Sequence, residues 1–182
     1  IICKMKKTLI LALLLSLLSI PGLKAQSAES ADVYLVTCAP GTASYSIYGH
    51  TALRITMRNA PFDMVYNWGI FDFSTPNFVY RFAKGKLDYM LGAYSYERFL
   101  EEYIAEGRSV WSQKLNLTTE EKEKLFALIN ENLKPENVKY RYDFFFDNCA
   151  TRVRDIVAAA AADTVIFPPK EKARSFRQLI DP

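Results

Sequence analysis

Alternating hydrophobic and polar positions predict β-strands in the first part of the chain. The runs 33–37, 51–57 and 64–68 are rich in β-branched and aromatic residues and are bounded by turn-forming residues. The segment 58–63 between the second and third runs holds the polar residues and the proline typical of a hairpin connection. We therefore expect 51–57 and 64–68 to pair as neighbours in an antiparallel sheet.

Helical spacing alternates with strand patterns in the rest of the chain. The expected elements are a short helix around Phe78 and Phe82, a strand over 89–94, a charged helix over 97–106 that Gly107 ends, and a strand over 110–117. Thr118 and Glu121 form the capping box of a further helix, which Pro135 closes. This order predicts an α+β domain in which a small antiparallel sheet packs against helices.

The last clear helix is expected to begin after Asp147 and Asn148, which are good helix-capping residues. Cys149 then lies in the first turn, and the apolar positions Val153 and Ile156 fall on the same stripe as the thiol. The thiol therefore points toward the surface on which the helix packs.

Residues 1–25 have the pattern of a secretory signal peptide. Lys6 and Lys7 give a charged start, 8–20 is an apolar run, and a Pro-Gly break precedes the small residue Ala25. The apolar run is shorter than the roughly 18 to 20 residues that span a bilayer. We expect residues 1–25 to be removed on export, with 1–4 being over-read sequence. The domain then covers 26–166, and 167–182 is a linker or a truncated continuation.

Removing this segment changes the charge and the aromatic content. Residues 1–25 hold four lysines and no acidic residue, so the remainder carries 19 basic and 20 acidic residues, scattered along the chain. Such a balance gives no electrostatic footprint for nucleic acid, which we exclude as a partner. All 25 aromatic residues follow residue 25. The exported domain is therefore expected to have an aromatic core or an aromatic groove.

Cys149 and His50 are the strongest candidates for chemistry, and His50 is the single histidine. A thiol at a helix N-terminus has a lowered pKa, because the positive end of the dipole and the free N–H groups favour the thiolate. If the helix packs on the sheet near His50, the two residues have the logic of a cysteine nucleophile and its base. A structural role for both, with Cys149 as a small buried side chain, is the alternative.

Supporting roles fall on neighbouring polar residues. Asn67, on the strand after that of His50, is the natural third group to orient the imidazole. Asp72 and Tyr66 stand behind it as possible support. The backbone N–H of Cys149 is our candidate oxyanion donor, with Asn148 as further support.

Other chemistries have no matching motif. Close ligand doublets such as CxxC or HExxH are absent, as are a phosphate-binding loop and a GxSxG elbow. We expect neither a metal nor a cofactor.

A disulfide between Cys38 and Cys149, in an oxidising compartment, is the alternative to a free nucleophile. The alternate aromatic residues of 140–146 either line one wall of a groove for an apolar substrate or fill the core.

Four ordered motifs resemble the Lnb N-terminal periplasmic domain family. They are TCAPG at 37–41, YGHTALR at 48–54, YNWGIFDF at 66–73 and YDFFFDNCATR at 142–152. The resemblance covers essentially the whole exported chain. It implies a periplasmic domain of a lipoprotein N-acyltransferase, which moves an acyl chain from a phospholipid to the amino group of a lipoprotein. Full-length relatives continue into membrane-spanning helices, so the resemblance also implies attachment to the inner membrane.

The order of the candidate residues is also similar to circularly permuted NlpC-type papain-like folds. That similarity implies a permuted papain-like fold with its nucleophile at a helix N-terminus. It makes Cys149 the nucleophile, His50 the base and Asn67 the third residue, with the acyl group carried as a cysteine thioester. Two other functions remain to be distinguished. One is a papain-like peptidase or amidase acting on cell-wall peptides, and the other is a non-enzymatic binding domain with a Cys38–Cys149 disulfide.

Overall fold

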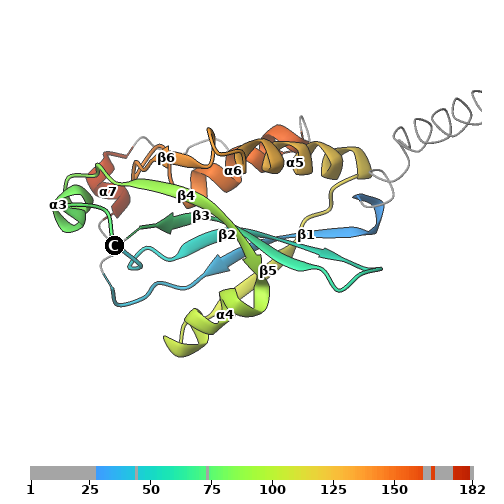
Figure 1. Ribbon diagram of the computed structural model, residues 1–182, viewed down its shortest axis with the longest axis horizontal. Helices are drawn as coiled ribbons and strands as arrows, with labels where there is room; N and C mark the ends of the chain where they lie inside the picture. The colour runs from blue at the N-terminus through green and yellow to red at the C-terminus, as the bar shows by residue number, and fades with distance from the viewer. Residues whose placement is uncertain (1–27, 44, 73, 162–164, 167–173, 181–182) are drawn as a thin grey trace, which may run out of the picture.

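An antiparallel sheet with helices on both faces makes up the computed structural model (Figure 1). The structure describes residues 28–43, 45–72, 74–161, 165–166 and 174–180. The expected signal peptide, residues 1–25, lies outside the described residues. So does most of 167–182, although a short helix is described within that segment.

The structure contains the predicted strands and helices in the predicted order, together with a short strand at Lys139–Arg141 and a short helix at Phe176–Ile180 that the pattern did not predict. In order they are β1 (Ala31–Cys38), β2 (His50–Met57), β3 (Asp63–Phe71), α3 (Phe78–Ala83), β4 (Asp88–Ser95), α4 (Tyr96–Ala105), β5 (Val110–Lys114), α5 (Thr119–Asn132), β6 (Lys139–Arg141), α6 (Cys149–Ala161) and α7 (Phe176–Ile180). Within the described residues the strands form one six-stranded sheet, in the order β5-β1-β2-β3-β4-β6. Each neighbouring pair is antiparallel, which confirms the predicted α+β class.

Helix α5 begins where the sequence predicts its capping box. The Thr118 hydroxyl accepts a hydrogen bond from the Glu121 N–H at 3.2 Å, and the Glu121 carboxylate accepts one from the Thr118 N–H at 2.8 Å. These bonds satisfy two N–H groups that a helix start leaves unpaired. The helix then turns Leu125 and Ile129 into the core, where both are almost fully buried.

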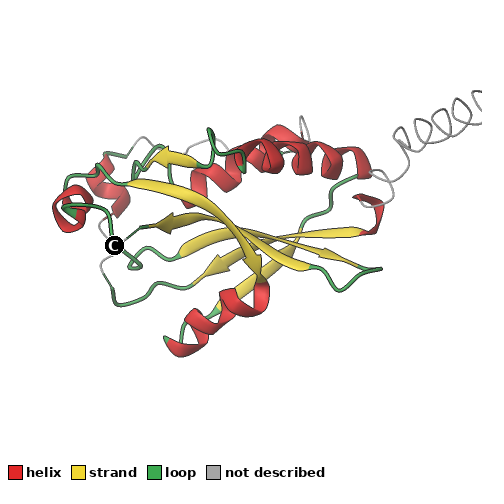
Figure 2. Ribbon diagram, viewed as in Figure 1, coloured by secondary structure: helices red, strands yellow, loops and turns green. Residues whose placement is uncertain are grey.

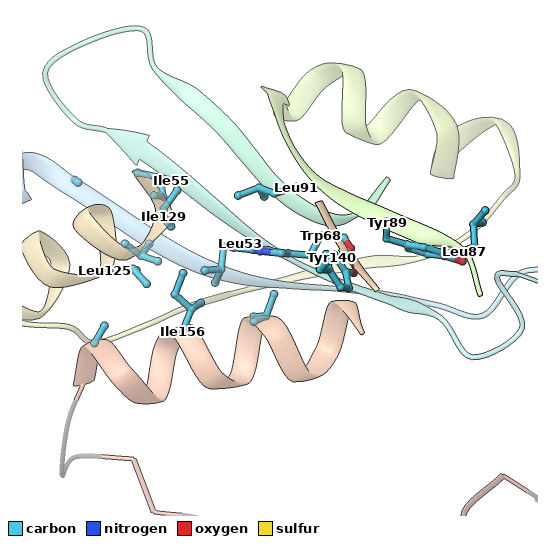
Figure 3. Close-up of a cluster of buried hydrophobic side chains, with 14 residues drawn as sticks. Leu53, Ile55, Trp68, Leu87, Tyr89, Leu91, Leu125, Ile129, Tyr140 and Ile156 are labelled. Atoms are coloured by element: carbon cyan, nitrogen blue, oxygen red, sulfur yellow. Dashed lines mark hydrogen bonds between the residues drawn. The ribbon is translucent and has the colours of Figure 1, made fainter. Parts of the chain in front are cut away.

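One face of the sheet is closed by α5 and α6. Alternate residues of β2, among them Leu53 and Ile55, pack there against Val153 and Ile156 of α6. Figure 3 shows Ile156 pointing from its helix toward the sheet, with Leu125 and Ile129 beside it. The stripe predicted for α6 is therefore confirmed as its packing face.

Helix α4 covers the opposite face (Figure 2). The intervening residues of the same strands, Cys38, Ala52 and Val65, pack there against Phe99 and Tyr103 of α4. His50 has the same parity as Ala52 along β2, so its ring lies on this second face, 6.5 Å from the ring of Phe99. The fold thus puts the single histidine and the stripe of α6 on opposite sides of one sheet.

The alternate aromatic residues of 140–146 divide between the two expectations from the sequence, because Tyr142 and Phe144 line the cleft beside Cys149 whereas Tyr140 fills the core. Only Lys139–Arg141 forms a strand, because a turn closed by two backbone hydrogen bonds between Asp143 and Asp147 interrupts the alternation. The Asp143 carboxylate also accepts from two backbone N–H groups within that turn. As a result Tyr140 is buried in the core, whereas Phe146 is 69% exposed.

Candidate active site

The N-terminus of α6 is fixed by Asn148. Its side-chain oxygen accepts hydrogen bonds from the N–H groups of Ala150 and Thr151, both at 2.9 Å. Its amide nitrogen donates to the carbonyl of Phe144 at 2.7 Å. Both ends of the Asn148 side chain are therefore used inside the loop, and they place Cys149 as the first residue of the helix.

Strands β2 and β3 part where α6 begins. Their ladder runs only from Leu53–Tyr66 to Thr56–Asp63, so the stretch that begins at His50 is not bonded to β3. On its other side β3 has a register shift against β4 between Asn67 and Ile70. Such a bulge re-aims the side chains next to it. The start of α6 therefore meets His50 at the end of the sheet, although the two lie on different faces.

Asn67 orients the imidazole of His50 and fixes its tautomer. The Asn67 side-chain oxygen accepts a hydrogen bond from the Gly69 N–H at 2.7 Å and lies 2.8 Å from the His50 Nε2. Because the same oxygen serves both contacts, Nε2 must carry the proton. The Asn67 amide nitrogen donates to the hydroxyl of Tyr94 at 2.8 Å. His50 Nδ1 is then the nitrogen left to face the Cys149 thiol.

Gly69 is required by the position of the imidazole. A Cβ atom at this residue would lie 2.4 Å from the His50 Cε1 and 3.1 Å from the Asn67 oxygen. The absence of a side chain thus lets the bulged strand donate its N–H to Asn67 while the histidine ring lies against the backbone.

Cys149 and His50 shift each other's pKa in opposite directions. Burial raises the pKa of the Cys149 thiol, but the hydrogen bond and charge of His50 and the N–H groups of Thr51 and Ala150 outweigh it, so the net shift is downward. Burial lowers the pKa of His50, and its hydrogen bond to Cys149 and the charge of the thiolate turn the net shift upward. Both shifts favour a thiolate–imidazolium pair.

Cys38 is a different kind of thiol. It pairs with His50 across β1 and β2, is 2% exposed, and contacts Tyr103. Burial raises its pKa to about 11, against the opposing effects of Tyr103 and Arg108. Cys38 and Cys149 are both free thiols in the structure. In this structure the Cys149 thiol contacts His50 and does not form the alternative disulfide with Cys38.

The Cys149–His50 pair opens on a cleft of about 1150 Å³. One part of its wall is apolar and aromatic, and includes Phe71, Phe82, Leu87, Tyr89, Phe144 and Phe145. The other part comes mainly from α4 and the loop after it, and includes the charged residues Arg98, Glu102 and Arg108. The volume slightly exceeds the roughly 300–1,000 Å³ that is usual for small-molecule sites. The reactive pair thus lies in a cleft with an apolar side and a charged side.

Comparison with known protein families assigns the chain to one of them. A model of the Lnb N-terminal periplasmic domain family matches residues 23–180. The chain belongs to this family. No curated protein and no solved structure matches the chain. Membership in the Lnb family makes this a periplasmic domain associated with the modification of lipoproteins.

Two residues that the sequence suggested as support lie away from the Cys149–His50 pair in this Lnb domain. Tyr66 has the opposite parity to Asn67 on β3, and it packs with the core on the α5 side of the sheet. Asp72 lies at the end of β3, exposed, where its carboxylate accepts hydrogen bonds from the N–H and hydroxyl of Ser74. The structure brings together Cys149, His50 and Asn67.

Sequence reasoning did not single out Tyr94 or Gly69. Tyr94 comes from β4, and nothing local in the sequence marks it as a partner of Asn67. Gly69 had a weak signal, since an isolated glycine inside a strand pattern indicates a bulge or a close approach.

Among the described residues no group of three or more His, Cys, Asp or Glu side chains could hold a metal ion. Within the same ranges no helix has the length and apolar character needed to cross a bilayer.

Proposed function

We propose that this Lnb domain is a cysteine-dependent acyltransferase that moves an acyl chain from a phospholipid to the N-terminal amine of a bacterial lipoprotein. The observation that carries the proposal is the hydrogen-bonded set of Cys149, His50 and Asn67 at the wall of a partly aromatic cleft. In this proposal Cys149 is the nucleophile, His50 the acid and base, and Asn67 the residue that orients the imidazole.

The first half-reaction acylates the thiol. The Cys149 thiolate attacks the ester carbonyl of the phospholipid, and the carbonyl oxygen takes up the negative charge. The backbone N–H of Cys149 at the α6 N-terminus is our nominee for stabilising that oxygen. When the intermediate collapses, the carbon–oxygen ester bond breaks and His50 gives its proton to the departing alkoxide. The products are a thioester on Cys149 and a lysophospholipid.

The second half-reaction transfers the acyl group. The amine of the acceptor attacks the thioester carbonyl, a carbon–nitrogen bond forms and the carbon–sulfur bond breaks. The amine loses a proton to neutral His50, which restores the imidazolium beside the thiolate. The oxidation state of every atom is unchanged, so the cycle needs no oxidant or reductant.

The two sides of the cleft suit the two substrates. Phe71, Phe82 and Phe145 offer an apolar wall of the kind that an acyl chain requires. On the other side Glu102 faces the site closely enough to act on the pKa of His50. Its carboxylate is suited to an acceptor ammonium group.

We extend the proposal to the fold. The order of elements matches that of permuted NlpC-type papain-like folds. The strand of the histidine comes first, the strand of the third residue second, and the helix that starts with the nucleophile last. The α+β architecture and the Cys–His–Asn set support that assignment. The same set also serves papain-like peptidases and amidases. The aromatic wall of the cleft favours the acyl transfer.

Intact mass of the protein after incubation with phospholipid vesicles tests the proposal. We expect a hydroxylamine-labile acyl adduct on Cys149, and its loss in Cys149→Ser and in His50→Ala. Discharge of the adduct by a lipopeptide amine, with N-acylation of that peptide, completes the test. Retained N-acylation in either variant contradicts the mechanism. Release of an amine from a muropeptide without any lipid donor indicates the peptidase or amidase instead.

A further inference from the structure

Helix α3 has an apolar face that the described part of the chain leaves exposed. Phe78 and Phe82 stack on each other, and Phe78 packs against Phe71, so this side of the helix is anchored to the domain. The other side carries Val79, which is 77% exposed, and Tyr80, which is 60% exposed. Aliphatic and aromatic side chains of this size are unusual at such exposure unless something covers them.

The charges on the segment that carries this face are all positive. Arg81, Lys84 and Lys86 lie in the stretch from residue 74 to residue 87, which holds no acidic residue. The ammonium group of Lys84 lies 4.7 Å from the centre of the Tyr80 ring. Beyond the stretch, the carboxylate of Asp88 is paired with Arg141 at 2.8 Å. The exposed apolar pair therefore lies on a segment that carries three cations and no carboxylate.

A second exposed apolar pair has the opposite electrostatic setting. Ile104 on α4 is 73% exposed and Trp111 on the neighbouring β5 is 58% exposed, close to the values of Val79 and Tyr80. Helix α4, however, carries three glutamates and one arginine. The two pairs are matched in apolar exposure and differ in the sign of the surrounding charge.

Helix α3 also borders the cleft. Phe82 and Lys84 line it together with Cys149, so the helix stands at the edge of the space that leads to the thiol. Phe144, which is 37% exposed, lines the same cleft from the loop before α6.

We propose that the exposed face of α3, formed by Val79 and Tyr80 with Arg81, Lys84 and Lys86, binds the surface of a phospholipid bilayer that contains anionic lipid. Apolar and aromatic side chains enter the boundary between headgroups and acyl chains, and the cations bind anionic headgroups. The contact is interfacial and spans nothing. Only the purpose of this binding rests on the proposed function: it would bring a phospholipid acyl chain to the apolar wall of the cleft.

The experiment uses the protein purified from the cells that export it. It measures binding to vesicles of phosphatidylethanolamine and phosphatidylglycerol by co-sedimentation. We expect the double variant Val79→Asp/Tyr80→Asp to bind the vesicles about tenfold or more weakly, because the two apolar side chains that enter the bilayer become charged. The matched control Ile104→Asp/Trp111→Asp places the same charges on the α4 side. It is expected to bind like the wild type.

A second variant tests the charge separately. Lys84→Glu/Lys86→Glu is expected to weaken binding to the anionic vesicles by about tenfold or more and to remove its dependence on salt, since each cation near the surface adds to the attraction. Vesicles of phosphatidylcholine alone should bind the wild type and this variant equally. Circular dichroism and the thermal midpoint confirm that all variants are folded.

Equal losses in the α3 and α4 double variants, or none in either, overturn the proposal. Its failure is separable from that of the acyltransferase. Cys149→Ser should bind vesicles like the wild type, and thioester formation from a monomeric short-chain phospholipid should be unchanged in Val79→Asp/Tyr80→Asp but reduced on vesicles. If no thioester forms at all while the binding difference persists, the membrane-binding proposal is supported and the acyltransferase proposal is contradicted.

Discussion

The two faces of the sheet are built for different purposes. Under α5 and α6 the interior is formed by aliphatic and aromatic side chains such as Leu53, Leu125 and Val153, each almost fully buried. Under α4 the same strands present Cys38, His50 and Asn67, which need hydrogen-bonding partners. In the described part of the chain every buried side-chain nitrogen and oxygen has one. Stability and reactivity are therefore separated by one sheet, and Cys149 connects them.

The largest effect is expected from Leu125→Ala on the apolar face. Leu125 is 0% exposed, and its truncation should lower the free energy of unfolding by about 2–5 kcal/mol. Urea unfolding measures the change. The volume-conserving Leu125→Met should lose less than about 1.5 kcal/mol. If Leu125→Ala, while folded, also loses thioester formation, the two faces are not independent.

Asn67→Ala is the corresponding change on the polar face. We expect the rate of thioester formation to fall about 100-fold, equivalent to about 2.7 kcal/mol, because the imidazole loses its orienting oxygen. Single-turnover mass spectrometry measures the rate. Asn67→Asp keeps an acceptor for both His50 and the Gly69 N–H and should retain most of it. Equal rates in the two variants would show that the oxygen has no role.

The two cysteines sharpen the comparison through pH. The pKa of Cys149 is lowered, so its thiolate should already react with iodoacetamide near neutral pH, below the ordinary thiol range near 8.5. Cys38, with a pKa raised to about 11, should stay unlabelled until the solution is strongly alkaline. His50→Ala removes the two largest effects that lower the pKa of Cys149, its hydrogen bond and its charge, and should slow neutral labelling by about tenfold. Peptide mapping at each pH provides the rates, and similar profiles for both thiols would contradict the assignment.

The smallest effect is expected from Tyr94→Phe. This variant removes the hydroxyl that accepts from the Asn67 amide, a contact one step further from the thiol. Thioester formation should fall by less than tenfold, since a hydrogen bond of this kind contributes about 1 kcal/mol. Tyr34→Phe, on the same face of the sheet beside Arg54, is the matched control and should be unchanged. A larger loss for Tyr94→Phe than for Asn67→Ala would reverse the proposed order of the chain of contacts.

Features set by short stretches of sequence were predictable. The capping box of Thr118 and Glu121, the hairpin of β2 and β3, and the start of α6 after Asn148 all depend on residues a few positions apart. The placement of Asn67 next to His50 also followed, because hairpin strands are neighbours. These predictions succeeded because local chemistry and the overall fold agree at these positions.

Features that depend on long-range packing were not predictable. The divergence of β2 from β3 and the bulge after Asn67 have no counterpart in the alternation of residues 64–71. Strand β6 was missed, and the regular aromatic alternation of 140–146 was broken by the turn at Asp143. A carboxylate that caps its own loop outweighs a weak strand pattern. Tyr94 became a partner of Asn67 only through the pairing of β3 with β4.

The order of the site's parts along the chain decides when the thiol becomes reactive. A chain that crosses a membrane from its N-terminus delivers the strands of His50 and Asn67 before helix α6. Until α6 docks, Cys149 lacks its imidazole partner and the Thr51 N–H, so these groups do not lower the pKa of its thiol. Completion of the fold is thus the activation step. A chain in which α6 has not yet packed on the sheet therefore lacks the contacts that lower the pKa of Cys149.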